Sequence, residues 1–472
     1  MNVTKSEYKD RQPQNGGYLQ KVSAEQREYA EVSAHKRITE NNITNADLST
    51  DDLLEKILDR GNLNTAFKKV KSNKGAGGID EMRVDELLPY LRENQKQLTQ
   101  SIRDGKYRPN PVRRVEIPKE EKGKARKLGI PTVVDRVIQQ AISQILTPIF
   151  EPQFSEYSYG FRPKRSAHNA ISQCQRNVNE GHTYVVDMDL EKFFDTVSQS
   201  KLIEVLSRTI KDGRVISLIH KYLRAGAVVR HRFEETEIGV PQGGPLSPLL
   251  SNIMLNELDK ELATRGHKFV RYADDCMIFC KSRKSAERTL NNIIPFIEGK
   301  LFLKVNRGKT TVARFKEVKF LGFAFYRYRR ECRVRMHPKS ISKMKTKIRE
   351  LTDRHNGWGN EFRVCKLKEY IQGWVNYFKK ADMKGLLETT DEWMRRRIRA
   401  IYWKQWKRVR TRIKMLIHLG IEKHKALEFA NTRKGYWRTS NSPILKRTLN
   451  NDTLKKLGYT FLLDYYKQIC VN

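Results

Sequence analysis

Two acidic clusters interrupt apolar, strand-like runs of this sequence. In the run TYVVDMDL, strict alternation places Asp187 and Asp189 on one face of a strand. In the run FVRYADDCMIFC, Asp274 and Asp275 fall between two apolar segments, as they would in a hairpin turn. Carboxylates on an apolar strand are costly to bury unless a cation neutralises them, so both clusters are candidates for a metal site. An ordinary turn is the competing interpretation of Asp274 and Asp275, because Asp is common in turns.

Such carboxylates would suit an in-line displacement at a phosphoryl group. When a 3′-hydroxyl attacks a nucleoside triphosphate, the attacking and the leaving oxygen both carry negative charge. Two Mg²⁺ ions about 3.5–4 Å apart stabilise both oxygens, and these hard cations are held by carboxylate oxygens. Asp189 and Asp274 are far apart in the sequence, so the fold must bring them together.

Composition favours a nucleic-acid partner. The 472 residues include 92 Lys and Arg against 54 Asp and Glu, a formal net charge of +38. Such an excess repels itself unless it meets a polyanion, and the basic residues run through the whole chain rather than along one amphipathic helix. No apolar run reaches the length of a membrane span. The cysteines lack CxxC pairs, which argues against a zinc site or a disulfide framework.

The candidate residues must be positioned by about three domains, judged by chain length. Residues 1–50 are polar, and we expect a flexible N-terminal extension. Residues 51–335 alternate strand-like runs with helices, which predicts one large α+β domain. Strand signals then stop, so we expect a helical domain over 336–415 and a small basic module over 416–472.

Two helices are specific enough to test. The first is expected after Thr50-Asp51-Asp52, which resembles an N-cap, with apolar residues at helical spacing: Leu53, Leu54, Ile57 and Leu58. The second spans 395–414, which holds ten Lys and Arg and no acid. Its apolar stripe is Ile398, Tyr402, Trp406, Val409 and Ile413. We expect its other face to bind phosphate; a merely solvated basic face is the alternative.

Three motifs in fixed order carry a family resemblance: DLEKFFD at 189–195, PQGGPLSP at 241–248 and YADD at 272–275. They resemble the palm motifs of a reverse transcriptase, in the wording of bacterial group II intron reverse transcriptases, also called maturases. The resemblance covers about residues 53–472. It implies a right-hand polymerase fold of fingers and palm, followed by an α-helical thumb or maturase domain and a small basic DNA-binding module.

The resemblance also implies a metal site. Asp189 matches the first-motif ligand because it stands five residues before an aromatic, Phe194, and Leu190 would offer its backbone carbonyl. Asp274 matches the main second-motif ligand and Asp275 its weaker neighbour. Asp187 fits less well and is interpreted as a supporting or solvent-facing acid. Two Mg²⁺ ions and deoxynucleoside triphosphates are the implied cofactors and substrates.

Nucleotide-binding roles follow in the same way. Phe194 would crowd a 2′-hydroxyl, and Gln242 would contact the template base and the incoming nucleotide. Lys119 and Arg126, in a fingers hairpin, would hold the triphosphate. Lys309 would protonate the leaving pyrophosphate, although a lone lysine in a loop is usually only solvated. The segment FLGF resembles the primer grip, with apolar packing as the competing explanation.

The implied partners are the intron RNA as template, a target DNA and a primer, with no membrane. The segment 367–383 resembles the thumb, and the segment 433–451 resembles a module for DNA target binding. No HNH nuclease pattern of His and paired Cys follows them, so we expect no bottom-strand cleavage. The implied location is the bacterial cytoplasm, on intron RNA and chromosomal DNA.

Two other functions stay open. One is an RNA-binding splicing factor that has lost polymerisation, although the acids at 189, 274 and 275 are all present. The other is a reverse transcriptase used elsewhere, such as in phage defence or spacer acquisition. The thumb and tail motifs favour the intron-linked type over this alternative.

Overall fold

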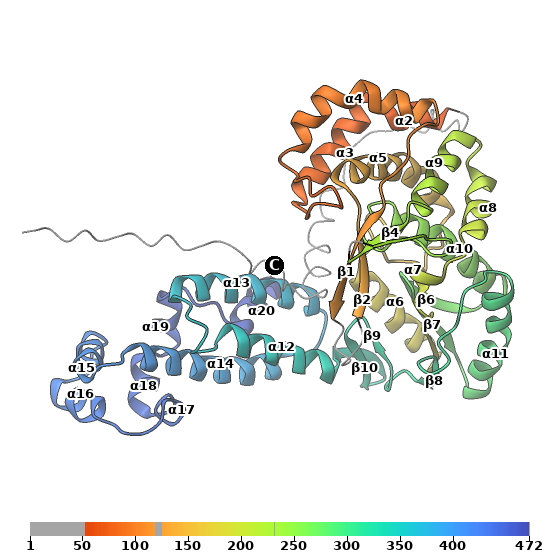
Figure 1. Cartoon of the computed structure of the whole chain (residues 1–472). Coiled ribbons are helices and arrows are strands. Elements are labelled where there is room, and N and C mark those ends of the chain that lie inside the picture. Colours follow the sequence, from red (N-terminus) through yellow and green to blue (C-terminus); the bar gives the residue numbers. More distant parts are fainter. Residues whose placement is uncertain (1–51, 119–124, 231, 472) are drawn as a thin grey trace, which may run out of the picture. The chain divides into compact units, whose positions relative to one another are not determined.

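The computed structural model describes residues 52–118, 125–230 and 232–471. These residues form three β-sheets and a long helical C-terminal region, labelled in Figure 1. In the described ranges, every helix is too short or too polar to cross a lipid bilayer.

The N-terminal helices pack around a shared apolar core: α2 (Leu53–Leu58), α3 (Arg60–Ser72), α4 (Leu87–Arg103) and α5 (Val133–Phe150). The apolar residues predicted for α2 are all buried. The predicted cap is wrong, because over the described part of the chain Asp52 makes no capping hydrogen bond. A distant carboxylate takes its place: the Leu54 N–H donates to Asp212 Oδ2 at 3.0 Å. Thr50 and Asp51 lie outside the described residues.

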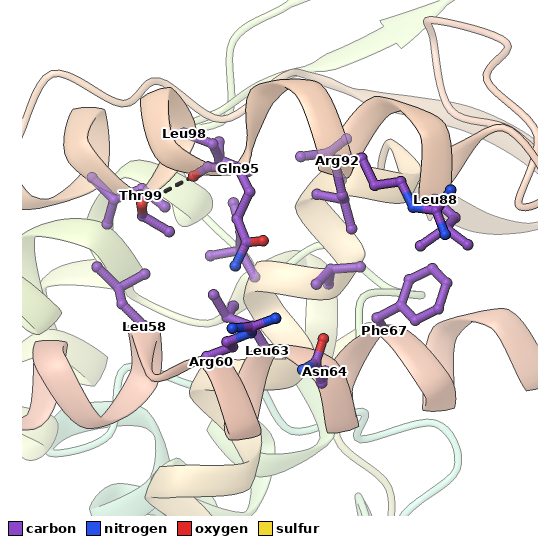
Figure 2. A pocket seen from close by; sticks show the side chains of 15 residues that line it. Leu58, Arg60, Leu63, Asn64, Phe67, Leu88, Arg92, Gln95, Leu98 and Thr99 are labelled. Carbon is purple, nitrogen blue, oxygen red and sulfur yellow. Dashed lines mark hydrogen bonds between the residues drawn. The ribbon is translucent and has the colours of Figure 1, made fainter.

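A cavity of about 200 Å³ lies among these helices. Figure 2 shows side chains of α3, including Leu63 and Phe67, opposite those of α4, including Leu88 and Leu98. Arg60 and Arg92 also line it, and none of the candidate acids does. This space is therefore separate from the acids discussed below.

The first sheet contains the fingers hairpin. Strand β1 (Val112–Pro118) pairs antiparallel with β2 (Ala125–Ile130) and parallel with β4 (Ala227–Val229), which pairs with β5 (Arg232–Glu234). The predicted hairpin is confirmed. Lys119 lies outside the described residues.

The second sheet is the palm, with strand order β6-β7-β3-β8 and antiparallel pairing throughout. Its strands are β3 (Tyr184–Met188), β6 (Lys268–Tyr272), β7 (Asp275–Cys280) and β8 (Thr311–Arg314). Helix α11 (Arg283–Gly299) packs against β3, β7 and β8, while α6 (Ala167–Asn179) and α10 (Ser247–Thr264) pack against β6. The consecutive residues Val185 and Val186 are both buried, so β3 is covered on both faces.

The remaining helices before the third sheet are η3 (Glu151–Gln153), α7 (Phe193–Thr196), α8 (Gln199–Thr209) and α9 (Gly213–Leu223).

The third sheet contains β9 (Lys319–Phe320), β10 (Phe323–Tyr328) and β11 (Glu331–Met336). The run VKFLGFAFYRY (318–328) forms two strands rather than one, because the chain turns between β9 and β10 at Leu321 and Gly322, both with positive φ.

Among the described residues beyond Met336, every regular element is a helix, as predicted. The longer ones are α12 (Pro338–Leu351), α13 (Asn360–Phe378), α14 (Lys384–Gln405), α15 (Val409–His418), α16 (Lys423–Ala430) and α20 (Leu462–Val471). The shorter ones are α17 (Tyr436–Thr439), α18 (Pro443–Thr448) and α19 (Asn451–Lys456).

The single basic helix predicted over 395–414 is wrong, because α14 ends at Gln405 and α15 begins at Val409. The Trp406 side chain is buried, and its carbonyl accepts a hydrogen bond from Arg412 Nε at 2.9 Å. The predicted stripe is therefore interrupted: Ile398, Tyr402 and Trp406 are buried, whereas Val409 is 39% exposed.

The basic face is also divided in its roles. Arg399 is buried and donates to the Ser440 carbonyl at 3.0 Å and the Leu449 carbonyl at 3.5 Å. Arg397 donates to Thr352 Oγ1 at 2.6 Å. Within this segment the exposed basic residues are Lys407, Arg408, Arg410 and Lys414. Phosphate contact by the whole face is thus excluded.

Candidate active site

The pairing of β3 with β7 brings the two acidic clusters to the same end of these two central strands of the palm sheet. Met188, the last residue of β3, lies opposite Cys276 near the start of β7. Asp189 follows β3 directly, and Asp274 and Asp275 lie where β7 begins. Because the strands are antiparallel, the end of one meets the beginning of the other.

The Asp-Asp pair lies at a hairpin turn, as predicted. Tyr272 of β6 is opposite Asp275 of β7, which leaves Ala273 and Asp274 as the two central residues. Ala273 has φ +55°, in the left-handed region that two-residue hairpin turns use and that few non-glycine residues adopt. Asp274 is half-buried and Asp275 is exposed.

Burial and the charge of Asp189 disfavour the ionisation of Asp187 and Asp274. Burial raises the pKa of Asp274, and the negative charge of Asp189 raises it further, while Arg126 and Arg271 act in the opposite direction. Burial and the charge of Asp189 raise the pKa of Asp187 to about 6. Asp187 is half-buried beside this group of acids rather than freely solvent-facing. A bound cation would relieve the repulsion among these carboxylates.

The donor set fits a divalent metal that a substrate helps to hold. Within the described ranges, no three His, Cys, Asp or Glu side chains converge as a ready-made metal cage. Mg²⁺ in phosphoryl-transfer sites is usually held by one or two carboxylates together with substrate phosphates and water. The acids at this end of β3 and β7 supply the first part of such a site.

One loop between α11 and β8 holds Asp189 in place. Asn306 Nδ2 donates to Asp189 Oδ2 at 2.8 Å, and the Asn306 N–H donates to the Asp189 carbonyl at 2.9 Å. The Asp189 N–H donates to Thr310 Oγ1 at 3.2 Å. The Lys309 ammonium lies 4.0 Å from Asp189 Oδ2, and Leu190 forms a β-bridge with Val305.

Asn306 and Thr310 were missed from the sequence. The sequence predicts a role for Lys309 in this loop, and nothing local shows that Asn306 meets an acid more than a hundred residues away. The structure thus brings Asp189, Leu190 and Lys309 together and adds two further side chains that hold Asp189.

The PQGG segment lies against the fingers strand β2. The Gly129 N–H donates to the Gln242 carbonyl at 2.6 Å. A Cβ on Gly243 would lie 2.5 Å from the Gly129 carbonyl, and one on Gly244 would lie 2.3 Å from Gln139 Oε1. Position 243, which meets backbone this closely and has φ +122°, therefore requires glycine. Gln242 itself is half-buried.

Two further predicted residues lie around this segment. Arg126 of β2 is exposed, and it is close enough to Asp274 to lower the pKa of that carboxyl. Phe194 is half-buried against the core, with its ring 5.2 Å from that of Phe193. Its carbonyl accepts from the Val240 N–H at 2.7 Å, which links the first acidic motif to PQGG.

The FLGF turn packs against the helical region. The Tyr377 hydroxyl donates to the Leu321 carbonyl at 3.0 Å, and Ser340 Oγ donates to the Gly322 carbonyl at 2.9 Å. Phe320 and Phe323 are buried. Apolar packing therefore accounts for both phenylalanines, and the turn is held by α12 and α13.

Comparison with known proteins agrees with this geometry. Residues 117–325 match the family of reverse transcriptases (RNA-dependent DNA polymerases), which places the chain in that class. Residues 341–418 match the group II intron maturase-specific domain.

Three relatives are similar to parts of this chain. Group II intron-encoded protein LtrA of Lactococcus lactis subsp. cremoris is 40% identical over 238 residues, covering 50% of this chain and 39% of LtrA. Protein YkfC of Escherichia coli is 35% identical over 298 residues, covering 55% and 77%. The putative COX1/OXI3 intron 2 protein of Saccharomyces cerevisiae is 30% identical over 382 residues, covering 68% and 43%. The chain spans less than half the length of LtrA and of the yeast protein.

This chain belongs to the group II intron-encoded reverse transcriptase and maturase family.

Proposed function

We propose that this protein is the RNA-directed DNA polymerase of a group II intron, which copies intron RNA into DNA. The observation that carries the proposal is the meeting of Asp189 with the Asp274–Asp275 turn at the same end of β3 and β7. Family membership supports it.

In this proposal Asp189, Asp274 and Asp275, with the Leu190 carbonyl, hold two Mg²⁺ ions. The ions supply charge stabilisation for the attacking and leaving oxygens when bound. Asn306 would hold the Asp189 carboxylate in one orientation through its side-chain hydrogen bond. The Lys309 ammonium lies 4.0 Å from Asp189 Oδ2 and would protonate the leaving pyrophosphate.

The nucleotide is held from the fingers side. Arg126 and Lys119 would bind the triphosphate, because a guanidinium fork and an ammonium both suit phosphate oxygens. Gln242, on the segment that packs against β2, would contact the template base and the incoming nucleotide. Phe194 would crowd a 2′-hydroxyl and so favour deoxynucleotides.

We also propose that the protein binds its intron RNA and promotes splicing and retrohoming, with target DNA and primer as further partners. Residues 336–415 would form the thumb or maturase domain and 416–472 the DNA-binding module. A basic protein that binds the folded RNA stabilises its compact form through linkage and needs no splicing chemistry of its own.

The test is primer extension on an RNA template with deoxynucleotides and Mg²⁺. We expect extension by the natural chain and none by the Asp274→Ala/Asp275→Ala variant. The matched control removes two adjacent exposed acids elsewhere, Glu234→Gln/Glu235→Gln, and should extend normally. A folded natural chain that binds RNA without extending any primer would favour a splicing factor without polymerase activity.

A second experiment separates the two roles. In a splicing assay at limiting Mg²⁺, the Asp274→Ala/Asp275→Ala variant should promote splicing as well as the natural chain does. Loss of splicing in this variant, with RNA binding intact, would contradict the separation of polymerase and maturase functions.

A further inference from the structure

The palm contains a fully buried arginine directly before the catalytic turn. Arg271, in β6, has 0% of its surface exposed, and so has its partner Asp259 in α10. Arg271 Nε donates to Asp259 Oδ1 at 2.7 Å and Nη2 donates to Oδ2 at 2.5 Å. This is a bidentate pair, the geometry that a guanidinium and a carboxylate favour.

The third arm of the guanidinium reaches the turn itself. Arg271 Nη1 donates to the Ala273 carbonyl at 3.0 Å and to Asn252 Oδ1 at 3.1 Å. The Ala273 carbonyl belongs to the peptide group that Ala273 shares with Asp274. One buried side chain thus connects α10 to the peptide bond that precedes a candidate metal ligand.

The other side of the turn rests on a glycine. A Cβ on Gly160 would lie 2.3 Å from the Ala273 nitrogen and 3.0 Å from the Tyr272 carbonyl carbon. Asn252 Nδ2 donates to the Gly160 carbonyl at 2.9 Å, so the residue that accepts from Arg271 also fixes this glycine. The turn is therefore held between Arg271 and the Gly160 backbone.

Stability alone does not account for the Arg271–Asp259 pair. Burying two charges carries a desolvation penalty that their attraction often only balances, and well-packed apolar residues can replace such a pair without loss of stability. An apolar pair cannot donate to the Ala273 carbonyl. Ala273 has φ +55°, a strained conformation for a non-glycine residue, which persists only where its surroundings hold it.

We propose that Arg271, locked by Asp259, is a positioning residue that fixes the Ala273–Asp274 turn and thereby the metal-binding geometry of Asp274 and Asp275. The part that concerns metal rests on the proposed function. The part that concerns the turn rests on the contacts alone.

The decisive variant is Arg271→Met/Asp259→Leu, which removes both buried charges and keeps apolar volume. We expect it to fold with a lowered melting temperature, because the Ala273 carbonyl and Asn252 Oδ1 lose a buried donor. In primer extension, kcat should fall at least tenfold and the Mg²⁺ concentration for half-maximal rate should rise severalfold, with primer–template affinity unchanged. Hydrogen exchange of the amides at 272–276 should be faster.

The matched control is another ion pair at the end of α10. Arg265 Nε donates to Glu261 Oε1 at 2.8 Å, and Arg265 Nη1 donates to the Asn292 carbonyl of α11 at 3.1 Å. The Arg265→Met/Glu261→Leu variant should keep kcat, Mg²⁺ dependence and exchange at 272–276 within twofold.

Gly160→Ala tests the same turn from its other side. The added methyl group should displace the turn, lower kcat and speed exchange at 272–276. Gly299→Ala is its control, because a Cβ there meets nothing within 4 Å.

A folded Arg271→Met/Asp259→Leu variant with kcat and exchange within twofold of the natural chain would overturn the proposal. If this double variant does not fold, the Arg271→Lys variant decides. Its single ammonium keeps the charge beside Asp259 but cannot also reach the Ala273 carbonyl, so we expect the same losses of kcat and of exchange protection. A normal kcat in this variant would overturn the proposal. If the natural chain itself extends no primer, the proposed function fails. Hydrogen exchange at 272–276 still tests whether Arg271 fixes the turn.

Discussion

At the residue scale, the candidate site depends on side chains that hold the acids as much as on the acids. Asn306 bonds Asp189 through both its side chain and its backbone N–H. A hydrogen bond to a charged group contributes about 1.5–3 kcal/mol. The hydrogen bond from the Asn306 side chain is therefore strong enough to favour one orientation of the Asp189 carboxylate.

We predict that Asn306→Ala lowers the rate of single-nucleotide incorporation about tenfold or more, because Asp189 loses that orientation. Asn306→Asp should lower it further, since a new negative charge would face Asp189. Quenched-flow measurement of single turnovers checks both. Asn292→Ala, on α11 away from the acids, is the control. Equal rates for Asn306→Ala and the natural chain would show that the loop backbone alone suffices.

At the element scale, buried residues of α14 hold other C-terminal helices in place through hydrogen bonds. Burial is the main cause that lowers the pKa of Arg399 to about 10, and repulsion from Arg395 and Arg396 adds to it. Arg399 is still charged at neutral pH and bonds two carbonyls of the segment that contains α18. Its role is to join helices rather than to bind phosphate.

We predict that Arg399→Met destabilises the fold by about 1–3 kcal/mol, because two buried carbonyls lose their donor. Its effect on the salt dependence of RNA binding should be small. Arg410→Gln, at an exposed position of α15, should do the reverse: an unchanged melting temperature and a salt slope reduced by up to about 1. Thermal melting and RNA titration of both variants decide this, and a stable Arg399→Met chain would contradict it.

Asp391 of α14 fixes the start of α20. Its two carboxylate oxygens accept from the Leu462 and Leu463 N–H groups at 2.9 and 2.8 Å. Burial is the main cause that raises the pKa of Asp391 to about 6, although these donors and Arg395 act to lower it.

A pH dependence follows from this raised pKa. Between about pH 4 and 6 the folded chain keeps the Asp391 proton that the unfolded chain has lost, so stability falls as the pH rises through that window. The slope attributable to Asp391 is at most about 1.4 kcal/mol per pH unit. We predict that the melting temperature of the natural chain, relative to Asp391→Asn, falls from pH 4 to 6 and is level above 7. A difference that does not change with pH would contradict the assignment.

At the scale of the whole molecule, the net charge of +38 dominates. Each phosphate that the protein neutralises releases counterions, so affinity for RNA depends steeply on salt. With 6–10 phosphate contacts, we predict that affinity for intron RNA falls by about 10³–10⁵ between 50 and 200 mM salt. Filter binding at several salt concentrations and fixed Mg²⁺ measures this. A change smaller than tenfold would show that few phosphates are contacted.

The sequence by itself determined the local features of this protein. Alternation along TYVVDMDL and FVRYADDCMIFC predicted the strands and the Asp-Asp hairpin, because neighbouring residues of a strand must point to opposite faces. Helical spacing identified the buried side of α2, and the net charge predicted a polyanionic partner.

Only the tertiary structure decided which distant groups meet. The pairing of β3 with β7 brought Asp189 to Asp274, Asp212 replaced the expected local cap of α2, and Arg399 found carbonyls instead of phosphate. The hydrogen bond from Arg271 to the Ala273 carbonyl is of the same kind. Local spacing settles which face a side chain occupies, whereas a hydrogen-bond partner far along the chain is settled by the packing that buries both groups together.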